Sequence, residues 1–262
     1  MDEIMMRALI VGVLISLSAS LIGTPLVLKR SSFLGDGLSH VAFGAFAIAS
    51  ALGFAPMAVT LLIVILASFL ILRLGESSKI HGDSAIALFM VSSLAIGTFV
   101  NALVGGNADV DEYLFGDIMT ISGVEVWAAL GLVLAIIGVY VLNHNKIFAI
   151  TFDEKFARAI GVNTKLYNAI FAVLCSVLIV LGMKLMGALL ISGLVVFPTL
   201  TAQTIFKNFK SVTIFSAVFA VINFVVGLML SYVWGSPAGA TVIIVNLIVL
   251  IALKIANKII KR

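Results

Sequence analysis

Residues 33–51 read FLGDGLSHVAFGAFAIASA, a stretch that is apolar enough to lie in a membrane yet carries two ionisable side chains, Asp36 and His40. Because they are four residues apart, these side chains lie on one face of a helix. Ionisable groups at membrane depth are costly and usually mark an ion or substrate path. A carboxylate and an imidazole are also a common ligand set for a divalent transition metal. The stretch therefore predicts a membrane-embedded helix with a metal-handling point on it.

The composition of the whole chain is that of a polytopic membrane protein. Of its 262 residues, 62% are hydrophobic and 11% are charged, whereas a soluble domain is usually about 25% charged. We expect an all-α fold, a transmembrane helical bundle that forms one domain over residues 1–262. The apolar N-terminal run lacks the basic head of a cleavable signal peptide and is long enough to span. The sole cysteine, Cys175, excludes an internal disulfide and a cysteine-rich metal site, and is expected to be a buried packing residue.

Nine apolar segments are candidates for crossing the membrane, because a span needs about 20 apolar residues. They lie near 5–28, 35–51, 57–74, 83–104, 122–142, 165–183, 186–205, 211–233 and 238–257. The second segment is short and rich in glycine, and the connection at 183–187 is short. Eight crossings with one re-entrant segment would also fit, since irregular backbone is tolerated where protein or water covers it. We expect about eight or nine membrane segments.

The basic residues orient these segments in a cell membrane. If the N-terminus lies outside, all 16 lysines and arginines except Arg7 and Lys184 fall on the inner side, in agreement with the positive-inside rule. The C-terminus is then cytoplasmic. The formal charge of +4 reflects this topology, so the sequence does not indicate a nucleic-acid surface.

Residues 143–164 form a long inner connection with a helical pattern of its own. Its apolar positions repeat with the spacing of one helix face: Phe152, Phe156, Ala159 and Ile160. Asp153 and Glu154 suit the start of such a helix, and Gly161 suits its end. One interpretation is an amphipathic helix on the membrane surface, and the other is a docking helix for a cytoplasmic partner. The mixed charges between the apolar positions do not favour attraction to anionic lipid.

Other polar residues are weaker candidates. Residues 105–121 carry four carboxylates and are expected to form an outer loop, which either concentrates cations, receives a binding protein or is simply solvated. His81 and His144 are expected to be solvated histidines of inner loops.

The late segment 187–205 carries small and helix-breaking residues. Gly187, Gly193 and Pro198 favour close helix packing and a kink, and Thr199 is a candidate for facing a pathway. No G-x-x-x-x-G-K-[ST] phosphate loop occurs in the chain. If transport is driven by ATP, another chain must bind the nucleotide.

The sequence resembles a known family, the membrane permease subunits of bacterial ABC importers for zinc, manganese or iron(II). Four stretches in order carry the resemblance, which covers essentially the whole chain: VLKRSSFLGDGLSHVAFGAFA (27–47), YLFGDIMTIS (113–122), FDEKFARAIGVN (152–163) and MGALLISGLVVFPTLTA (186–202). The first contains the Gly-Asp-x-x-x-His core of the family signature. The third is similar to the inner coupling helix of the family, here about 153–161.

The resemblance implies a fold like that of type II ABC importers and a set of partners. These are a second permease copy (a homodimer or a pair of related permeases), two cytoplasmic ATP-binding subunits, an extracytoplasmic metal-binding protein and the membrane lipid. The chain is then not an enzyme, because ATP is hydrolysed on a partner. It binds no permanent cofactor, and its cargo is a divalent metal ion, with zinc slightly favoured over manganese or iron(II).

The resemblance also implies roles for particular residues. In the family the Asp and His of the signature coordinate the passing metal, which here means Asp36 and His40. The inner helix seats in a groove of the ATPase, which here means Phe152, Asp153, Glu154, Phe156, Ala157, Arg158 and Gly161.

The spacing of Asp36 and His40 alone leaves two interpretations open. If the helix begins just after Arg30, the two side chains stand roughly 9–15 Å in from the inner surface, and two subunits together offer four metal ligands. Alternatively, Asp36 caps the helix after Gly35 and His40 bonds a nearby carbonyl.

Three rival functions also remain at this stage. The first is an ion-coupled secondary transporter in which Asp36 and His40 relay protons. The second is an ABC permease for chelated iron or a corrinoid. The third is a membrane-embedded enzyme, although no nucleophile–base set accompanies the pair.

Overall fold

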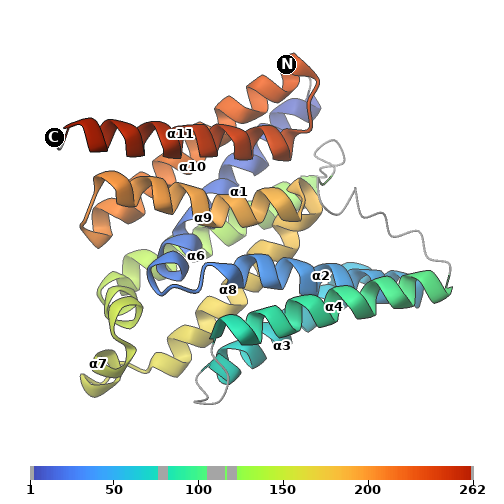
Figure 1. Cartoon of the computed structure of the whole chain (residues 1–262). Helices are drawn as coiled ribbons and strands as arrows, with labels where there is room; N and C mark the ends of the chain where they lie inside the picture. Colours follow the sequence, from blue (N-terminus) through green and yellow to red (C-terminus); the bar gives the residue numbers. More distant parts are fainter. Residues whose placement is uncertain (1–2, 76–81, 105–115, 117–122, 261–262) are drawn as a thin grey trace.

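The computed structural model of the chain describes residues 3–75, 82–104, 116 and 123–260. Every regular element in this part of the chain is a helix (Figure 1). The helices are α1 (Glu3–Leu28), α2 (Phe33–Ala51), α3 (Pro56–Gly75), α4 (Gly82–Val104), α6 (Gly123–Phe152), α7 (Glu154–Ala159), α8 (Thr164–Met186), α9 (Ala188–Ile205), α10 (Phe209–Trp234) and α11 (Ala238–Ile260). Nine of these, all except α7, are long and apolar enough to cross a membrane. The Gly-rich second segment is one uninterrupted helix, so the described residues fit nine crossings better than eight.

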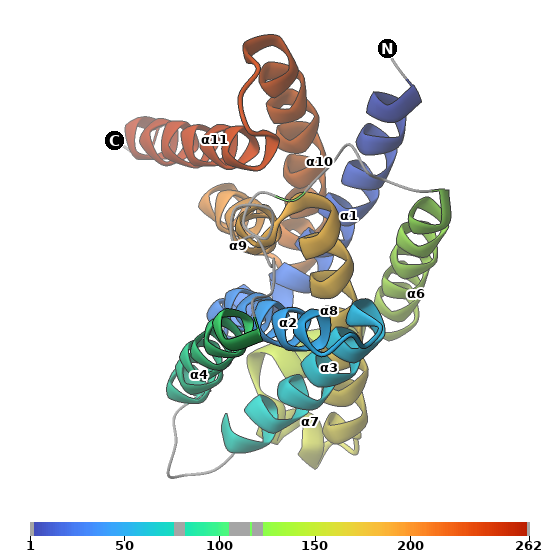
Figure 2. The same ribbon diagram turned by 90° about the vertical axis from the view of Figure 1, so that its right-hand side faces the viewer.

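The helices form a multi-pass bundle whose centre is lined by α1, α8 and α9. Figure 2 shows α2, α3 and α4 together on one side of the bundle and α10 and α11 on the other, with α8 and α9 between them. α1 contacts α6, α8, α9 and α10, while α2 packs between α4, α3, α8 and α9. The largest fully buried side chains are concentrated on the central helices, among them Ile15, Ile22, Leu178, Leu190 and Leu194. Apolar packing on several sides therefore holds α2, the helix with the ionisable pair.

α2 and α4 approach each other backbone to backbone. A Cβ atom on Gly97 would lie 2.5 Å from the Cα of Gly44, and a Cβ on Gly44 would lie 2.3 Å from the carbonyl oxygen of Ser93. Small residues permit such contacts between membrane helices, where van der Waals packing replaces the hydrophobic driving force. The glycines of the second segment therefore serve helix packing and leave the helix intact.

Hydroxyl and amide groups join the later helices inside the bundle. The Thr199 hydroxyl lies 3.0 Å from that of Ser216 and 3.4 Å from that of Thr24, so the three connect α9 to α10 and α1. Asn223 of α10 donates to Asn246 of α11 at 2.9 Å. All these side chains are buried, and bonds of this kind hold membrane helices in register.

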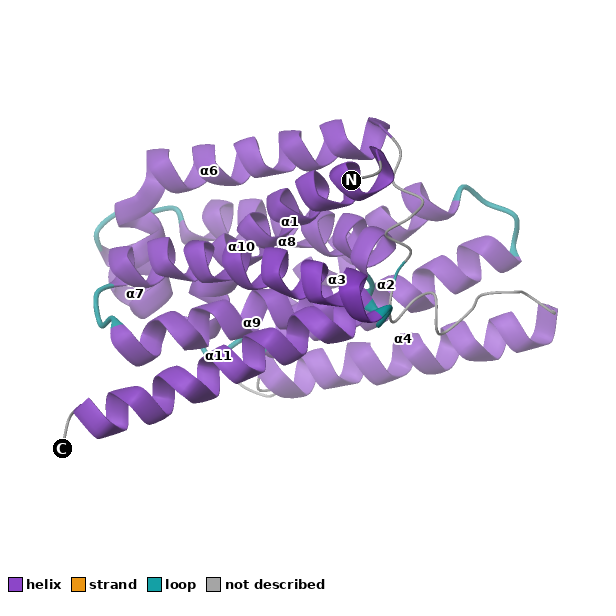
Figure 3. Cartoon of the chain, turned by 90° about the horizontal axis from the view of Figure 1, so that it is seen from above, coloured by secondary structure: helices purple, strands orange, loops and turns teal. Residues whose placement is uncertain are grey.

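The short helix α7 and the C-terminus lie at the same end of the bundle, on the left in Figures 1 and 3. α1, α3 and α11 end there with basic residues, and α8 begins there with Lys165. Lys184, at the far end of α8, is one of the two exceptions to the charge rule, and its Nζ lies 2.5 Å from Glu125 Oε1 of α6. The Glu125 carboxylate therefore neutralises Lys184.

The prediction that residues 143–164 are mostly a loop is wrong for their first part. α6 continues to Phe152 and has non-helical backbone angles only at Asn143 (φ −128°, ψ 21°). Tyr167 of α8 donates to the Asn143 side chain at 2.7 Å. The His144 ring packs against Phe209 with centroids 5.5 Å apart, so His144 is not a loop histidine. His81 and the carboxylates of residues 105–121 lie outside the described residues.

Candidate functional site

α2 begins immediately after a tight turn at the end of α1. Arg30 takes a positive φ of 62°, and the Leu34 amide donates to the Ser31 carbonyl at 3.1 Å. The residue at the N-cap position is Ser32, which makes no side-chain capping bond. Asp36 lies in the first turn, where a negative charge is favourable. The interpretation that Asp36 caps the helix is therefore wrong.

Asp36 and His40 lie on one face of α2, as their spacing predicts. The distance from His40 Nε2 to Asp36 Oδ1 is 3.9 Å. The Asp36 side chain is 44% exposed and that of His40 is 24% exposed, whereas the neighbouring Leu38 and Ser39 are fully buried. The pair therefore faces an accessible surface of the chain, while most other residues of α2 pack into the bundle.

A third polar side chain reaches the pair from α9. Ser192 Oγ donates to Asp36 Oδ1 at 3.1 Å, across 156 residues of sequence. A hydroxyl that bonds a ligating carboxylate orients that carboxylate. The sequence carried no separate signal for Ser192, because a serine in an apolar run is ordinary; only the packing of α9 against α2 brings it to Asp36.

The described part of one chain does not hold a full set of metal ligands. Within the described ranges, no group of three or more His, Cys, Asp or Glu side chains is arranged to hold a metal ion. Protein sites for zinc and similar ions usually use three or four protein ligands. Asp36 and His40 of one chain alone fall short of that number, and their role as metal ligands stays a prediction.

The predicted inner helix is present as α7. It is shorter than the apolar pattern that predicted it, which runs from Phe152 to Ile160. Asp153 is its N-cap, and its side chain accepts from the Phe156 amide at 2.9 Å. Gly161 ends the turn with a φ of +86°, a conformation that suits glycine. Ala157 is buried, whereas Phe152, Phe156 and Ile160 are each 57% exposed. The apolar face therefore points away from the bundle.

Polar contacts tie α7 to the bundle through Glu154. Its carboxylate accepts from Asn168 of α8 at 3.1 Å and lies 3.8 Å from the Lys29 ammonium at the end of α1. Arg158 Nη2 lies 3.3 Å from the same carboxylate, and Arg158 Nε bonds Thr164. Glu154 and Arg158 therefore connect α7 to the end of α1 and to α8.

The late segment is interrupted at Gly187, and a kink at Pro198 stays a prediction. Gly187 takes φ 84° and ψ 156° as the single residue between α8 and α9, whereas α9 runs through Pro198 as one helix. A Cβ on Gly193 would lie 3.0 Å from Ile243 of α11, so this glycine does permit close packing. Gly116 covers the joint, since a Cβ there would lie 2.3 Å from the Gly187 nitrogen. A pathway role for the buried Thr199 stays a prediction.

In the described residues, an all-helical bundle of nine candidate spans with a short helix at its basic end defines a multi-pass membrane protein. The particular family follows from the sequence comparison: the chain belongs to the ABC 3 transport family, whose pattern matches residues 1–257. The resemblance described from the four sequence stretches is confirmed.

Several curated proteins are similar along nearly the whole chain. A probable metal transport system membrane protein of Treponema pallidum is 31% identical over 248 residues, covering 94% of this chain and 92% of the relative. The manganese import system permease protein ScaB of Streptococcus gordonii is 26% identical, covering 96% and 91%. A probable metal transport system membrane protein of Thermotoga maritima is 28% identical, covering 91% and 84%.

Two solved structures share the fold. PsaBC from Streptococcus pneumoniae, in complex with Fab, matches with a TM-score of 0.83 at 24% identity, covering 96% of this chain and 91% of that one. An inward-facing conformation of a putative metal-chelate type ABC transporter matches with a TM-score of 0.69 at 16% identity, covering 95% and 84%. The prediction of an ABC-importer-like helical bundle is therefore confirmed.

Proposed function

We propose that this chain is the membrane-spanning permease subunit of an ATP-driven importer that passes a divalent transition-metal ion into the cytoplasm. The observation that supports this most directly is the Asp36–His40 pair, which stands on one accessible face of α2 with its carboxylate bonded by Ser192. Membership of the ABC 3 transport family and the metal-transport names of the relatives point to the same function.

The metal passes through a site completed by a second permease copy. Two chains facing each other across a two-fold axis supply two carboxylates and two imidazoles. A site divided between two subunits also releases its ion when the subunits separate. Such a ligand set suits manganese, iron(II) and zinc. We place manganese before zinc, because several of the curated relatives are named for manganese transport.

ATP is hydrolysed on separate subunits that engage α7. Phe152, Phe156 and Ile160 form an exposed apolar face at the end of the bundle, and Glu154 and Arg158 connect this face to α1 and α8. The positive-inside rule assigns the same end, and with it the C-terminus, to the cytoplasm. An extracytoplasmic metal-binding protein then delivers the ion at the opposite end.

The experiment that tests the proposal measures uptake of radioactive manganese and zinc in cells that express the chain with its ATP-binding and metal-binding partners. Asp36→Asn and His40→Gln are expected to abolish uptake at unchanged expression, because each removes one ligand type from the shared site. Asp83→Asn, in the first turn of α4, and His144→Gln, in α6, are matched controls that should retain uptake.

Two of the rival functions, both transporters, predict different results. A secondary transporter would move metal when the chain is reconstituted alone on a gradient, whereas we expect it to be inert without the ATPase. A permease for chelated iron or a corrinoid would retain its transport in Asp36→Asn and His40→Gln. Wild-type metal uptake by both variants would refute the proposed site.

A further inference from the structure

The inner end of α6 extends beyond the hydrocarbon core of the membrane. α6 has 30 residues, which make about 45 Å of helix at about 1.5 Å per residue, whereas about 20 apolar residues are enough to cross the core. The helix is mainly apolar up to Leu142, and the polar run Asn143–Lys146 follows at the kink. Residues 147–152 therefore lie on the aqueous side of this polar run.

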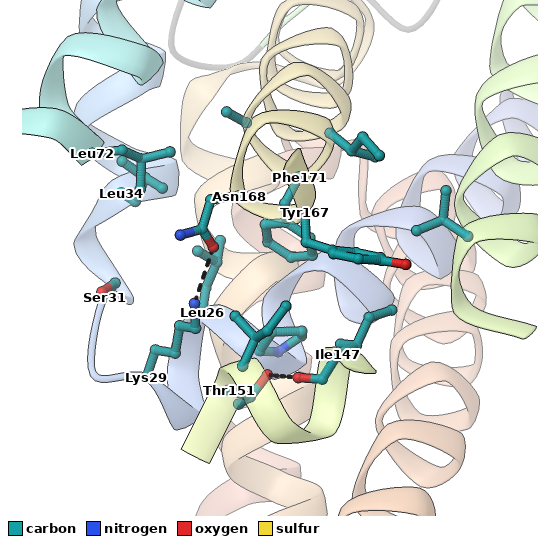
Figure 4. A pocket seen from close by; sticks show the side chains of 15 residues that line it. Leu26, Lys29, Ser31, Leu34, Leu72, Ile147, Thr151, Tyr167, Asn168 and Phe171 are labelled. Atoms are coloured by element: carbon teal, nitrogen blue, oxygen red, sulfur yellow. Dashed lines mark hydrogen bonds between the residues drawn. The ribbon is translucent and has the colours of Figure 1, made fainter. Parts of the chain in front are cut away.

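One face of this extension packs into the bundle. Ile147, Ile150 and Thr151 are buried, and they line a small cavity together with Tyr167 of α8 (Figure 4). The Thr151 hydroxyl donates to the Ile147 carbonyl of the same helix at 2.6 Å. The bundle therefore holds the extension in place from this side.

A second face of the extension carries aromatic side chains. Phe148 and Phe152 are 46% and 57% exposed, and their ring centroids are 5.0 Å apart. Both rings pack against the buried Phe209, the first residue of α10, with centroid distances of 5.5 and 6.1 Å. Phe148, Phe152 and Phe209 therefore form a preorganised aromatic platform that joins the end of α6 to α10.

The aromatic platform continues the exposed face of α7. Only Asp153 separates the two helices, and Phe156 and Ile160 follow Phe152 at four-residue intervals with the same exposure of 57%. A run of large apolar side chains exposed to water marks an interaction site, and aromatic residues often contribute most of the binding energy of an interface. The candidate surface is therefore larger than α7 alone.

The free charges beside this surface are positive. Lys155 precedes Phe156 and Lys210 follows Phe209, and both lysines are exposed. Neither lysine forms an ion pair within the part of the chain that the structure describes. The carboxylates at the start of α7 are already bound inside the chain. An apolar centre with a charged rim is the usual anatomy of a protein interface, and a rim of lysines is complementary to carboxylates.

We infer that the aromatic platform and the exposed face of α7 form one docking surface, and that the ATP-binding subunit covers it with an apolar groove whose rim carries carboxylates. The inference rests on the proposed function for the identity of the partner, and it extends the contact from α7 to α6 and α10. Lipid chains do not cover this surface, because it lies beyond the polar run at the kink. Since α10 contacts α1, α9 and α11, the platform connects the partner to helices that α7 does not touch.

The test measures the affinity of the purified ATP-binding subunit for the full chain in phosphatidylcholine nanodiscs, without metal. Phe148→Ala is expected to weaken binding about tenfold, because it truncates an aromatic anchor. Trp127→Ala, which removes an exposed aromatic from the opposite end of α6, is the matched control and should bind like wild type.

The charged rim is tested by salt and by charge reversal. Lys210→Glu is expected to weaken binding about fivefold at low salt and less at high salt, because salt screens the attraction between exposed charges. Lys254→Glu reverses an exposed lysine of α11 near the same end of the bundle and should have little effect.

Each other result has a distinct meaning. Wild-type affinity in a Phe148→Ala variant that is as thermally stable as Trp127→Ala would restrict docking to α7 and overturn the platform. Equal effects of Lys210→Glu and Lys254→Glu would overturn the acidic rim. Failure of the wild-type chain to bind the ATP-binding subunit would refute the ATP-driven function itself and the inference with it, so the two failures are distinguishable.

Discussion

The hydrogen bond from Ser192 restricts the rotation of the Asp36 carboxylate, which a carboxylate on the surface would not experience. Its hydroxyl holds Oδ1 at 3.1 Å, while His40 stands 3.9 Å from the same oxygen. A group that hydrogen-bonds a metal-ligating side chain fixes the orientation of that side chain. It therefore changes the metal affinity without contacting the ion. Ser192 is therefore a positioning residue for the proposed metal site.

Removing this hydroxyl should weaken the site without abolishing it. Ser192→Ala is expected to raise the manganese concentration for half-maximal uptake about three- to tenfold; a bond to a charged group contributes roughly 1.5–3 kcal/mol, and less where the group is accessible. The measurement is the concentration dependence of uptake at matched expression.

Ser39→Ala is the control for Ser192→Ala. Ser39 lies on α2 beside the pair, but its hydroxyl bonds the Gly35 carbonyl of its own helix at 3.0 Å. An equal loss in both variants would assign the effect to packing and not to Asp36.

At the scale of the element, α7 is a six-residue helix that could not persist alone. It is stabilised by the Asp153 cap and by the contacts of Glu154 with α1 and α8, since so short a helix in water is unstable. Ala157 is buried against the bundle, whereas Phe156 on the outer face is 57% exposed. Polar contacts hold α7 on one side, while Phe156 is exposed on the other. An exposed apolar face of this kind is typical of an interface.

Truncating this face should uncouple the ATPase. Phe156→Ala is expected to lower metal-stimulated ATP hydrolysis by the assembled complex about tenfold or more, because a buried aromatic anchor often contributes 2 kcal/mol or more to an interface. Manganese binding to the purified chain should be unchanged. The control is Phe99→Ala, which truncates an exposed aromatic on α4. Normal ATP hydrolysis in Phe156→Ala would contradict the docking role and favour a helix that rests on the membrane surface.

At the scale of the whole molecule, the nine candidate spans of the described residues predict that the two chain ends lie on opposite sides of the membrane. A chain with Cys175→Ala has no native thiol, so single cysteines report sidedness. Phe54→Cys, in the exposed turn between α2 and α3, should react with an impermeant thiol reagent added to intact cells. Lys258→Cys, on the last turn of α11, should react only after the membrane is opened. The reverse pattern would invert the assigned orientation.

The helices were predictable because their signal lies in local composition. For eight of the nine candidate spans, the bounds predicted from apolar runs agree with the helix bounds within a few residues. The exception is α6, which extends beyond its predicted end. Asn143, His144 and Asn145 predict a loop by polarity, yet Tyr167 and Phe209 provide partners for the first two and the helix continues. Tertiary contacts overrode the local pattern.

The candidate site was predictable only in the part that lies on one helix. The four-residue spacing of Asp36 and His40 places them on a common face in any helix. Ser192, Lys29 and Asn168 become neighbours of functional groups only through packing between elements far apart in sequence. The periodicity of a single helix cannot predict contacts between residues of different helices.

The single-residue joint at Gly187 has a mechanical consequence for delivery of the ion. Gly116 rests directly on this joint, and Ser192 lies five residues further along α9, roughly 7–8 Å of helix. If a docked protein displaced Gly116, we expect α9 to tilt about Gly187. The Ser192 hydroxyl would then move away from Asp36. A displacement of Gly116 is therefore expected to reach the proposed metal site through α9.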